Sequence, residues 1–138
     1  MKESPSVLVV DDDTAMREMV VSLLREEGFD AEAAIGADDA LVRLRDGFVR
    51  VVLSDIQMPG KSGFDFLCEA RRLAPNVPVI LMTSFGGVVI ADRASHEGAF
   101  ACLSKPFSRE ELLEVLARAL LQRASARRNP QALRVQRG

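Results

Sequence analysis

Tryptophan and tyrosine are absent from the 138 residues, and cysteine occurs only at Cys68 and Cys102. Two isolated cysteines exclude a disulfide framework and a cysteine-rich zinc site, and they fit a reducing compartment. No segment reaches the roughly 18 apolar residues in a row that a membrane span needs. The start, MKESPS, lacks the apolar run of a signal peptide. We therefore expect a cytoplasmic protein without a membrane segment.

Charge of one sign is missing from the end of the chain. Residues 115–138 hold six arginines and no acid, whereas residues 1–114 carry 12 basic against 20 acidic groups, a net charge of −8. An acidic body argues against a nucleic-acid face on the body itself. We expect one domain over 1–122 and a basic tail over 123–138. A solvated extension or linker stub is the favoured interpretation of this tail, and binding to an acidic partner or nucleic acid is the alternative.

Short apolar runs alternate with amphipathic segments along the chain. The runs cover residues 7–10, 31–35, 51–53, 79–82 and 100–103. Runs that are apolar at successive positions are typical of strands buried on both faces of a parallel sheet. After each run, apolar residues recur at helical spacing, as in Met16, Met19, Val20, Leu23 and Leu24; Ala40, Leu41 and Leu44; Phe64, Leu67 and Ala70; residues 88–96; and Leu112, Val115, Leu116, Ala119 and Leu120. Five strand–helix units predict an open, doubly wound α/β sheet.

Polar side chains follow four of the predicted strands, at the edge where ligands bind in such sheets. The first strand is followed by Asp11, Asp12 and Asp13, the third by Asp55, the fourth by Thr83 and Ser84, and the fifth by Lys105. Crowded carboxylates repel one another unless a cation lies among them, and oxygen ligands suit Mg²⁺. Because Mg²⁺ keeps positions for phosphate oxygens, the pattern predicts a phosphoryl-transfer site with a carboxylate nucleophile.

Each of these residues also has a purely structural interpretation. Asp13 is expected to be the N-cap of the first helix and not a ligand. Asp55 fits turn chemistry, Thr83 with Ser84 fits another N-cap, and Lys105 fits a solvated loop lysine. Each alternative is favoured when taken alone. However, these polar residues all occur at corresponding strand ends, and this coincidence favours a shared site.

Four segments resemble the receiver domain of bacterial two-component response regulators, in order and in spacing, over roughly residues 5–122. They are VLVVDDD, LSDIQMPGKSGFDFL, VILMTSFG and EGAFACLSKPF. The third and fourth are most similar to receivers of the nitrogen-regulator and nodulation-regulator groups. The resemblance implies a flavodoxin-like (βα)5 fold with a five-stranded parallel sheet in the order 2-1-3-4-5.

The resemblance also implies roles for individual residues. Asp55 would accept a phosphoryl group from a sensor histidine kinase or phosphotransfer protein. Asp11 and Asp12 would hold Mg²⁺ together with Asp55 and the backbone carbonyl of Gln57. Thr83 would move to bond the phosphoryl group, and Lys105 would pair with Asp55 before phosphorylation and with the phosphate after it. The Lys105–Pro106 bond is cis in the family.

Switching in the family couples Thr83 to an aromatic residue on the fifth strand, where this chain has Cys102. The usual aromatic rotation is therefore in doubt, and we hypothesise that Phe100 or Phe85 fills the space. The output face would consist of helix 88–96, strand 100–103 and the helix that begins at Ser108, and a homodimer through this face is one arrangement. Val88, Val89 and Ile90 are expected in the core, with contact to a partner as the alternative.

Two other functions compete with the receiver interpretation. A haloacid-dehalogenase-type hydrolase also forms an aspartyl phosphate, but it carries a second acid two residues after the nucleophile, where this chain has Gln57. A passive Mg²⁺-binding module is the other. We expect a switch that catalyses only its own phosphorylation and dephosphorylation, either alone or as part of a longer regulator with a downstream output domain. The single histidine, His96, is expected at the surface and not as a phosphodonor.

Overall fold

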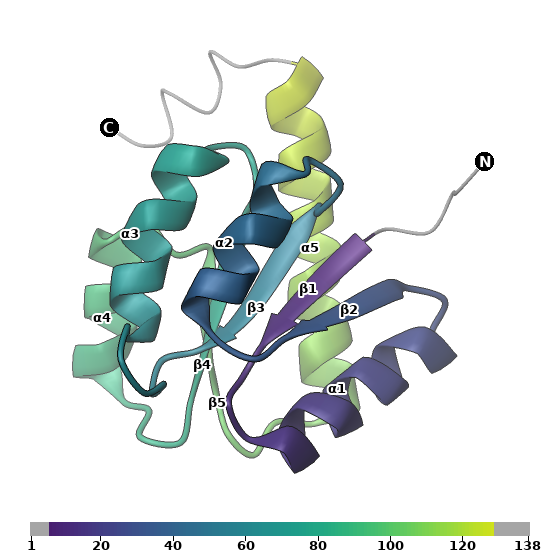
Figure 1. Ribbon diagram of the computed structural model, residues 1–138. Coiled ribbons are helices and arrows are strands. Elements are labelled where there is room, and N and C mark those ends of the chain that lie inside the picture. Colours follow the sequence, from purple (N-terminus) through teal and green to yellow (C-terminus); the bar gives the residue numbers. More distant parts are fainter. Residues whose placement is uncertain (1–5, 129–138) are drawn as a thin grey trace.

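The computed structural model describes residues 6–128, with side chains described over 6–122 (Figure 1). Strands and helices alternate along the whole of this range. The elements in chain order are β1 (Ser6–Val10), α1 (Thr14–Glu26), β2 (Asp30–Ala34), α2 (Ala37–Arg45), β3 (Val51–Asp55), α3 (Gly63–Leu73), β4 (Val79–Thr83), α4 (Val88–His96), β5 (Ala101–Ser104) and α5 (Arg109–Arg128). The five predicted strand–helix units are confirmed.

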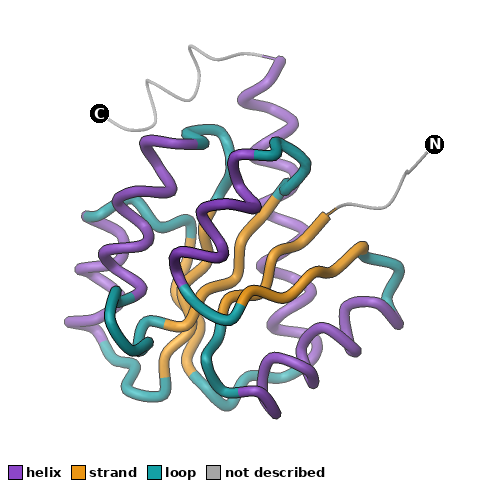
Figure 2. The backbone as a smooth tube through the Cα atoms, in the orientation of Figure 1, coloured by secondary structure: helices purple, strands orange, loops and turns teal. Residues whose placement is uncertain are grey.

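The strands form one parallel sheet in the order β2-β1-β3-β4-β5. This is the predicted flavodoxin-like arrangement. Chain order and sheet order differ at β1, which lies between β2 and β3. Because all strands run the same way, their carboxyl ends lie at one edge of the sheet, toward the lower part of Figures 1 and 2.

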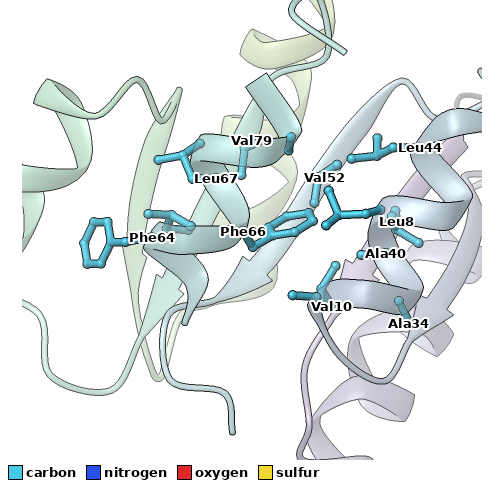
Figure 3. Packing of buried hydrophobic residues seen from close by; sticks show 14 of the residues in the cluster. Leu8, Val10, Ala34, Ala40, Leu44, Val52, Phe64, Phe66, Leu67 and Val79 are labelled. Carbon is cyan, nitrogen blue, oxygen red and sulfur yellow. The ribbon is translucent and has the colours of Figure 1, made fainter. Parts of the chain in front are cut away.

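Both faces of the sheet are covered, which explains why its strands are apolar at successive positions. Leu8 and Val10 point into a cluster with residues of α2, α3 and α4, whereas Val7 and Val9 point into a second cluster with residues of α1 and α5. Figure 3 shows Phe66 of α3 packed toward Leu8 and Val52 in the first cluster. Alternating side chains therefore make two cores from one run of sequence.

The helix starts follow local capping rules. Asp13 caps α1, since its side chain accepts from the backbone N–H groups of Ala15 and Met16. This confirms the N-cap that we expected there. Ser108 and Glu111 form reciprocal side-chain bonds to each other's backbone before and within the first turn of α5. Ser62 and Asp65 form an equivalent capping box at α3, which the sequence analysis did not identify.

Three expectations about apolar residues were wrong. Strand β2 ends at Ala34, and Ile35 is an exposed loop residue. Val88 and Val89 were expected in the core, but they are 86% and 81% exposed. Only Ile90 of that trio is partly buried against the first cluster. Nothing in the described part of the chain packs over the first two residues of α4, so apolar composition alone did not determine burial there.

Glycine at position 63 is required by the approach of α3 to β3. A Cβ atom added to Gly63 would meet the backbone oxygen of Asp55 and lie 2.6 Å from Cα of Ile56. The Gly63 N–H donates to the Ile56 carbonyl at 2.7 Å. The start of α3 is thereby fixed against the backbone that carries Asp55.

Gly63→Ala should lower the free energy of unfolding by about 3 kcal/mol, at the upper end of overpacking costs, because the neighbouring atoms belong to the backbone. Urea unfolding followed by circular dichroism measures this change. Gly36→Ala is the matched control, because no atom lies within 4 Å of its added Cβ. Equal midpoints for the two variants would contradict the packing at Gly63.

Candidate functional site

Three carboxylates converge beyond the carboxyl ends of β1 and β3. Asp11 is fully buried, Asp12 is exposed, and Asp55 is 8% exposed as the last residue of β3. One oxygen from each of the three lies within 4.8 Å of the others. The predicted cluster is therefore assembled, with one open side at Asp12.

Lys105 brings a cation to these carboxylates from the loop after β5. Its Nζ donates to Oδ2 of Asp11 at 3.2 Å and lies 3.6 Å from Oδ2 of Asp55. The expected pairing with Asp55 is present, but the shorter contact is with Asp11. The Lys105–Pro106 peptide bond is cis, as expected from the resemblance.

Thr83 lies at the end of β4, beside Asp55 and Lys105. Strand β4 pairs with β3 on one side and β5 on the other, and the Lys105 N–H donates to the Thr83 carbonyl at 2.7 Å. The Thr83 side chain is buried, and its Oγ1 accepts from the Phe85 N–H at 2.9 Å. This bond leaves the hydroxyl hydrogen available to a new acceptor. Thr83 and Ser84 do not cap α4, because Gly87 is its N-cap residue.

The loop after Asp55 bends back toward the carboxylates. The Gln57 N–H donates to Oδ1 of Asp55 at 3.3 Å. The Gln57 side chain is exposed. The backbone N–H of Gln57 is therefore in contact with the Asp55 carboxylate.

Burial is the largest influence on the ionisation of Asp55. Loss of solvent raises the pKa of its carboxyl above the ordinary value, the charge of Lys105 opposes this, and the charge of Asp11 adds to it. Burial and like charge together outweigh the single lysine. Without a further cation, the ionised cluster is electrostatically strained.

Arg17 is a site residue that the sequence analysis did not identify. Its guanidinium, on α1, donates to the backbone carbonyl of Asp11 at 2.7 Å, and the Asp13 N–H donates to Oδ1 of Asp11 at 3.0 Å. These bonds fix the loop that carries Asp11 and Asp12. Every residue has a backbone carbonyl, so the sequence does not show which carbonyl an arginine will contact. The role of Arg17 could therefore not be predicted from residue types.

Cys102 is half-buried against the first cluster, close to the side of α4. Burial raises the pKa of its thiol. Phe100 packs against the second cluster, on the other face of the sheet, and Phe85 is 66% exposed. Our hypothesis that either ring fills the space beside Cys102 is therefore wrong.

Comparison with known proteins decides the family. The profile of the response regulator receiver domain matches residues 7–117. The chain belongs to the response regulator receiver family. A receiver domain protein from Clostridium thermocellum superposes with a TM-score of 0.82 at 29% identity, over 87% of this chain and 97% of that one.

Relatives of this receiver domain include longer regulators. It is 34% identical over 119 residues to the C4-dicarboxylate transport transcriptional regulatory protein DctD of Rhizobium meliloti, a match of 86% of this chain and 26% of DctD. It is also 34% identical over 125 residues to Nodulation protein W of Bradyrhizobium diazoefficiens, a match of 91% of this chain and 55% of that protein. The chain thus spans about a quarter to a half of these relatives.

The receiver assignment leaves the hydrolase alternative without support. The family is a signalling family, and position 57 carries an exposed glutamine where that alternative needs an acid.

Within the described residues no helix is long and apolar enough to cross a membrane. His96 is exposed on α4, as expected.

Asp55→Asn should stabilise the receiver domain at neutral pH in Mg²⁺-free buffer. Because the pKa of Asp55 is raised on folding, the folded state holds this proton more firmly than the unfolded chain, and stability falls as pH rises through the folded pKa. We expect a midpoint of thermal unfolding higher than wild type by about 3 °C at pH 7, the shift that about 1 kcal/mol produces in a domain of this size.

The difference should shrink as the pH is lowered, because the wild-type carboxyl then becomes increasingly protonated. Asp13→Asn is the matched control, because its carboxylate is exposed and asparagine caps a helix equally well. A lower midpoint for Asp55→Asn than for wild type at pH 7 would contradict the strain in the cluster.

Proposed function

We propose that this receiver domain is a phosphorylation switch in which Asp55 accepts a phosphoryl group from a sensor histidine kinase or a phosphotransfer protein. The observation that carries the proposal is the convergence of Asp11, Asp12 and Asp55 within 4.8 Å, with the Lys105 ammonium at their edge. Phosphoryl transfer needs concentrated positive charge and an oxygen nucleophile in line. The domain would catalyse only its own phosphorylation and dephosphorylation.

The donor set at this site fits Mg²⁺. All three side-chain ligands are carboxylates, without sulfur or imidazole, which is the chemistry of a hard divalent ion. Asp11, Asp12 and Asp55 would hold it with the backbone carbonyl of Gln57. When bound, Mg²⁺ supplies charge neutralisation to the carboxylates and to the oxygens of the transferring group.

The residues of the chain divide the chemistry among them. An Asp55 oxygen attacks phosphorus, the bond from phosphorus to the donor breaks, and the donor group leaves with the electron pair. Lys105 lies 3.6 Å from Asp55 and would stabilise charge on the phosphoryl oxygens. The Thr83 hydroxyl, one strand away, would turn to donate its hydrogen to one of them.

The output of the switch would pass through α4, β5 and α5. Val88 and Val89 give this face an apolar patch that a partner would cover. The partner would be an output domain, a separate protein or a second copy of the chain.

We place the receiver domain at 1–122 and its basic tail, or linker stub, at 123–138, in a cytoplasmic protein that either stands alone or belongs to a longer regulator. The receiver body itself is not expected to bind nucleic acid.

Incubation with acetyl phosphate and Mg²⁺ should add one phosphoryl group per chain, as measured by intact mass. Asp55→Asn should abolish this addition, chelation of Mg²⁺ should prevent it, and Lys105→Ala should slow it on the order of 100-fold. His96→Gln is the control and should be labelled like wild type. Labelling of Asp55→Asn at the wild-type rate would overturn the assignment of the nucleophile, and no labelling of wild type would leave only a passive Mg²⁺-binding module.

Phe85 is proposed to set the lifetime of the phosphoryl group, because it lies two residues past Thr83 and bonds its hydroxyl oxygen through the backbone. An apolar ring at the mouth of the site would limit access of water to phosphorus. The phosphoryl group on Asp55 should therefore be hydrolysed faster in Phe85→Ala than in wild type. Intact mass recorded over time measures the loss of the phosphorylated form. Equal decay rates would show that the exposed ring does not shield the site.

A further inference from the structure

Helix α4 is held to the rest of the domain by little apolar burial. Among its residues only Ala94 is buried, Ile90 is partly buried, and Val88 and Val89 point into solvent. By contrast, α3 buries Phe64, Phe66 and Leu67, as well as two small residues. Contacts other than apolar packing must therefore contribute to the position of α4.

Arg93 supplies one such contact. Its guanidinium carbon lies 3.9 Å from the centre of the Phe64 ring, a cation–π arrangement between α4 and α3. The Phe64 ring is buried, and in Figure 3 it lies on the other side of α3 from Phe66. Glu97, the C-cap residue of α4, pairs with Arg93 at 2.7 Å on the exposed side of the helix.

Phe64 is itself attached to the backbone that carries Asp55. It follows Gly63, whose N–H donates to the Ile56 carbonyl and whose position leaves no room for a side chain against Asp55. A change in the backbone at Asp55 and Ile56 therefore moves the start of α3, and with it the ring beneath Arg93.

A cleft beside this contact leaves room for α4 to move. Its volume is about 580 Å³, and its walls include Gln57 and Met58 from the loop after Asp55 and Ile90 and Arg93 from α4. At the far end of α4, Arg71 of α3 donates to the Gly98 carbonyl at 2.9 Å. The helix is thus anchored at its carboxyl end, while its amino end faces the cleft.

We propose that Arg93 is a positioning residue that couples α4 to the backbone after Asp55, through its stacking on Phe64. This route does not use the fifth-strand position that holds Cys102 in place of an aromatic residue. The inference rests on the proposed function for its signalling role, because phosphorylation of Asp55 is the event that would be transmitted. Loss of the contact loosens α4 in the resting state and weakens the response of α4 to phosphorylation.

Hydrogen exchange of the backbone amides in α4 tests the resting state without any phosphorylation. Arg93→Ala and Phe64→Leu should each raise exchange of the 88–96 amides about two- to fivefold relative to the α1 amides, the range expected for an exposed cation–π contact. The double variant should not exceed Phe64→Leu, since Arg93 has no ring left to stack on in that background. Two controls, Glu97→Gln, which retains the stacking, and Arg72→Ala, an exposed arginine on α3, should change exchange less than twofold.

Unchanged α4 exchange in Arg93→Ala, or multiplied effects in the double variant, would overturn the proposal. The second measurement compares α4 exchange with and without acetyl phosphate and Mg²⁺. A smaller change on phosphorylation in Arg93→Ala than in wild type supports the coupling, and an equal change in both, at equal labelling of Asp55, refutes it. If wild type is not labelled at all, the proposed function fails, while exchange in the resting state still decides whether Arg93 positions α4.

Discussion

Mutual repulsion among Asp11, Asp12 and Asp55 is the constraint on which the rest of the site depends. Three carboxylates within 4.8 Å, two of them buried, are costly for any fold to hold. The parallel arrangement makes the cluster possible, because β1 and β3 are neighbours and end at the same edge of the sheet. Burial raises the pKa of Asp55, the charge of Asp11 adds to this, and Lys105 opposes the rise only in part. A divalent cation among these carboxylates would relieve both the burial of charge and the repulsion.

The contrast between sheet and helix α4 explains how such a site can act as a switch. Strands β1, β3 and β4 are buried on both faces and carry the acids and Thr83 on a rigid base. Helix α4 lines the cleft next to Asp12 but buries mainly Ala94, and Arg93 adds a cation–π contact with Phe64 of α3. Elements with little burial open at a lower free energy than core elements. Helix α4 is therefore the element near Asp55 that we expect to shift at the lowest free-energy cost.

Sequence alone predicted the five strand–helix units and the convergence of residues 11, 12, 55, 83 and 105, and the resemblance supplied the strand order. These predictions were possible because the residue types and their spacing mark both the buried strands and the acids at the strand ends. Failures occurred where tertiary geometry decides. Val88 and Val89 look like core residues but are exposed at the start of α4, and Ile35 lies past the end of β2. Arg17 acts on a backbone carbonyl, and Arg93 meets Phe64 from another helix, so neither contact has a local pattern.

The most direct test of the central claim is the thermal unfolding midpoint of the protein as Mg²⁺ is added. If the carboxylates form a divalent-ion site in the folded state only, the wild-type midpoint should rise with Mg²⁺ concentration as mass action requires. Asp12→Asn, which removes the exposed ligand without disturbing the core, should flatten that dependence. A wild-type midpoint that is independent of Mg²⁺, or one that rises equally in Asp12→Asn, would contradict the account.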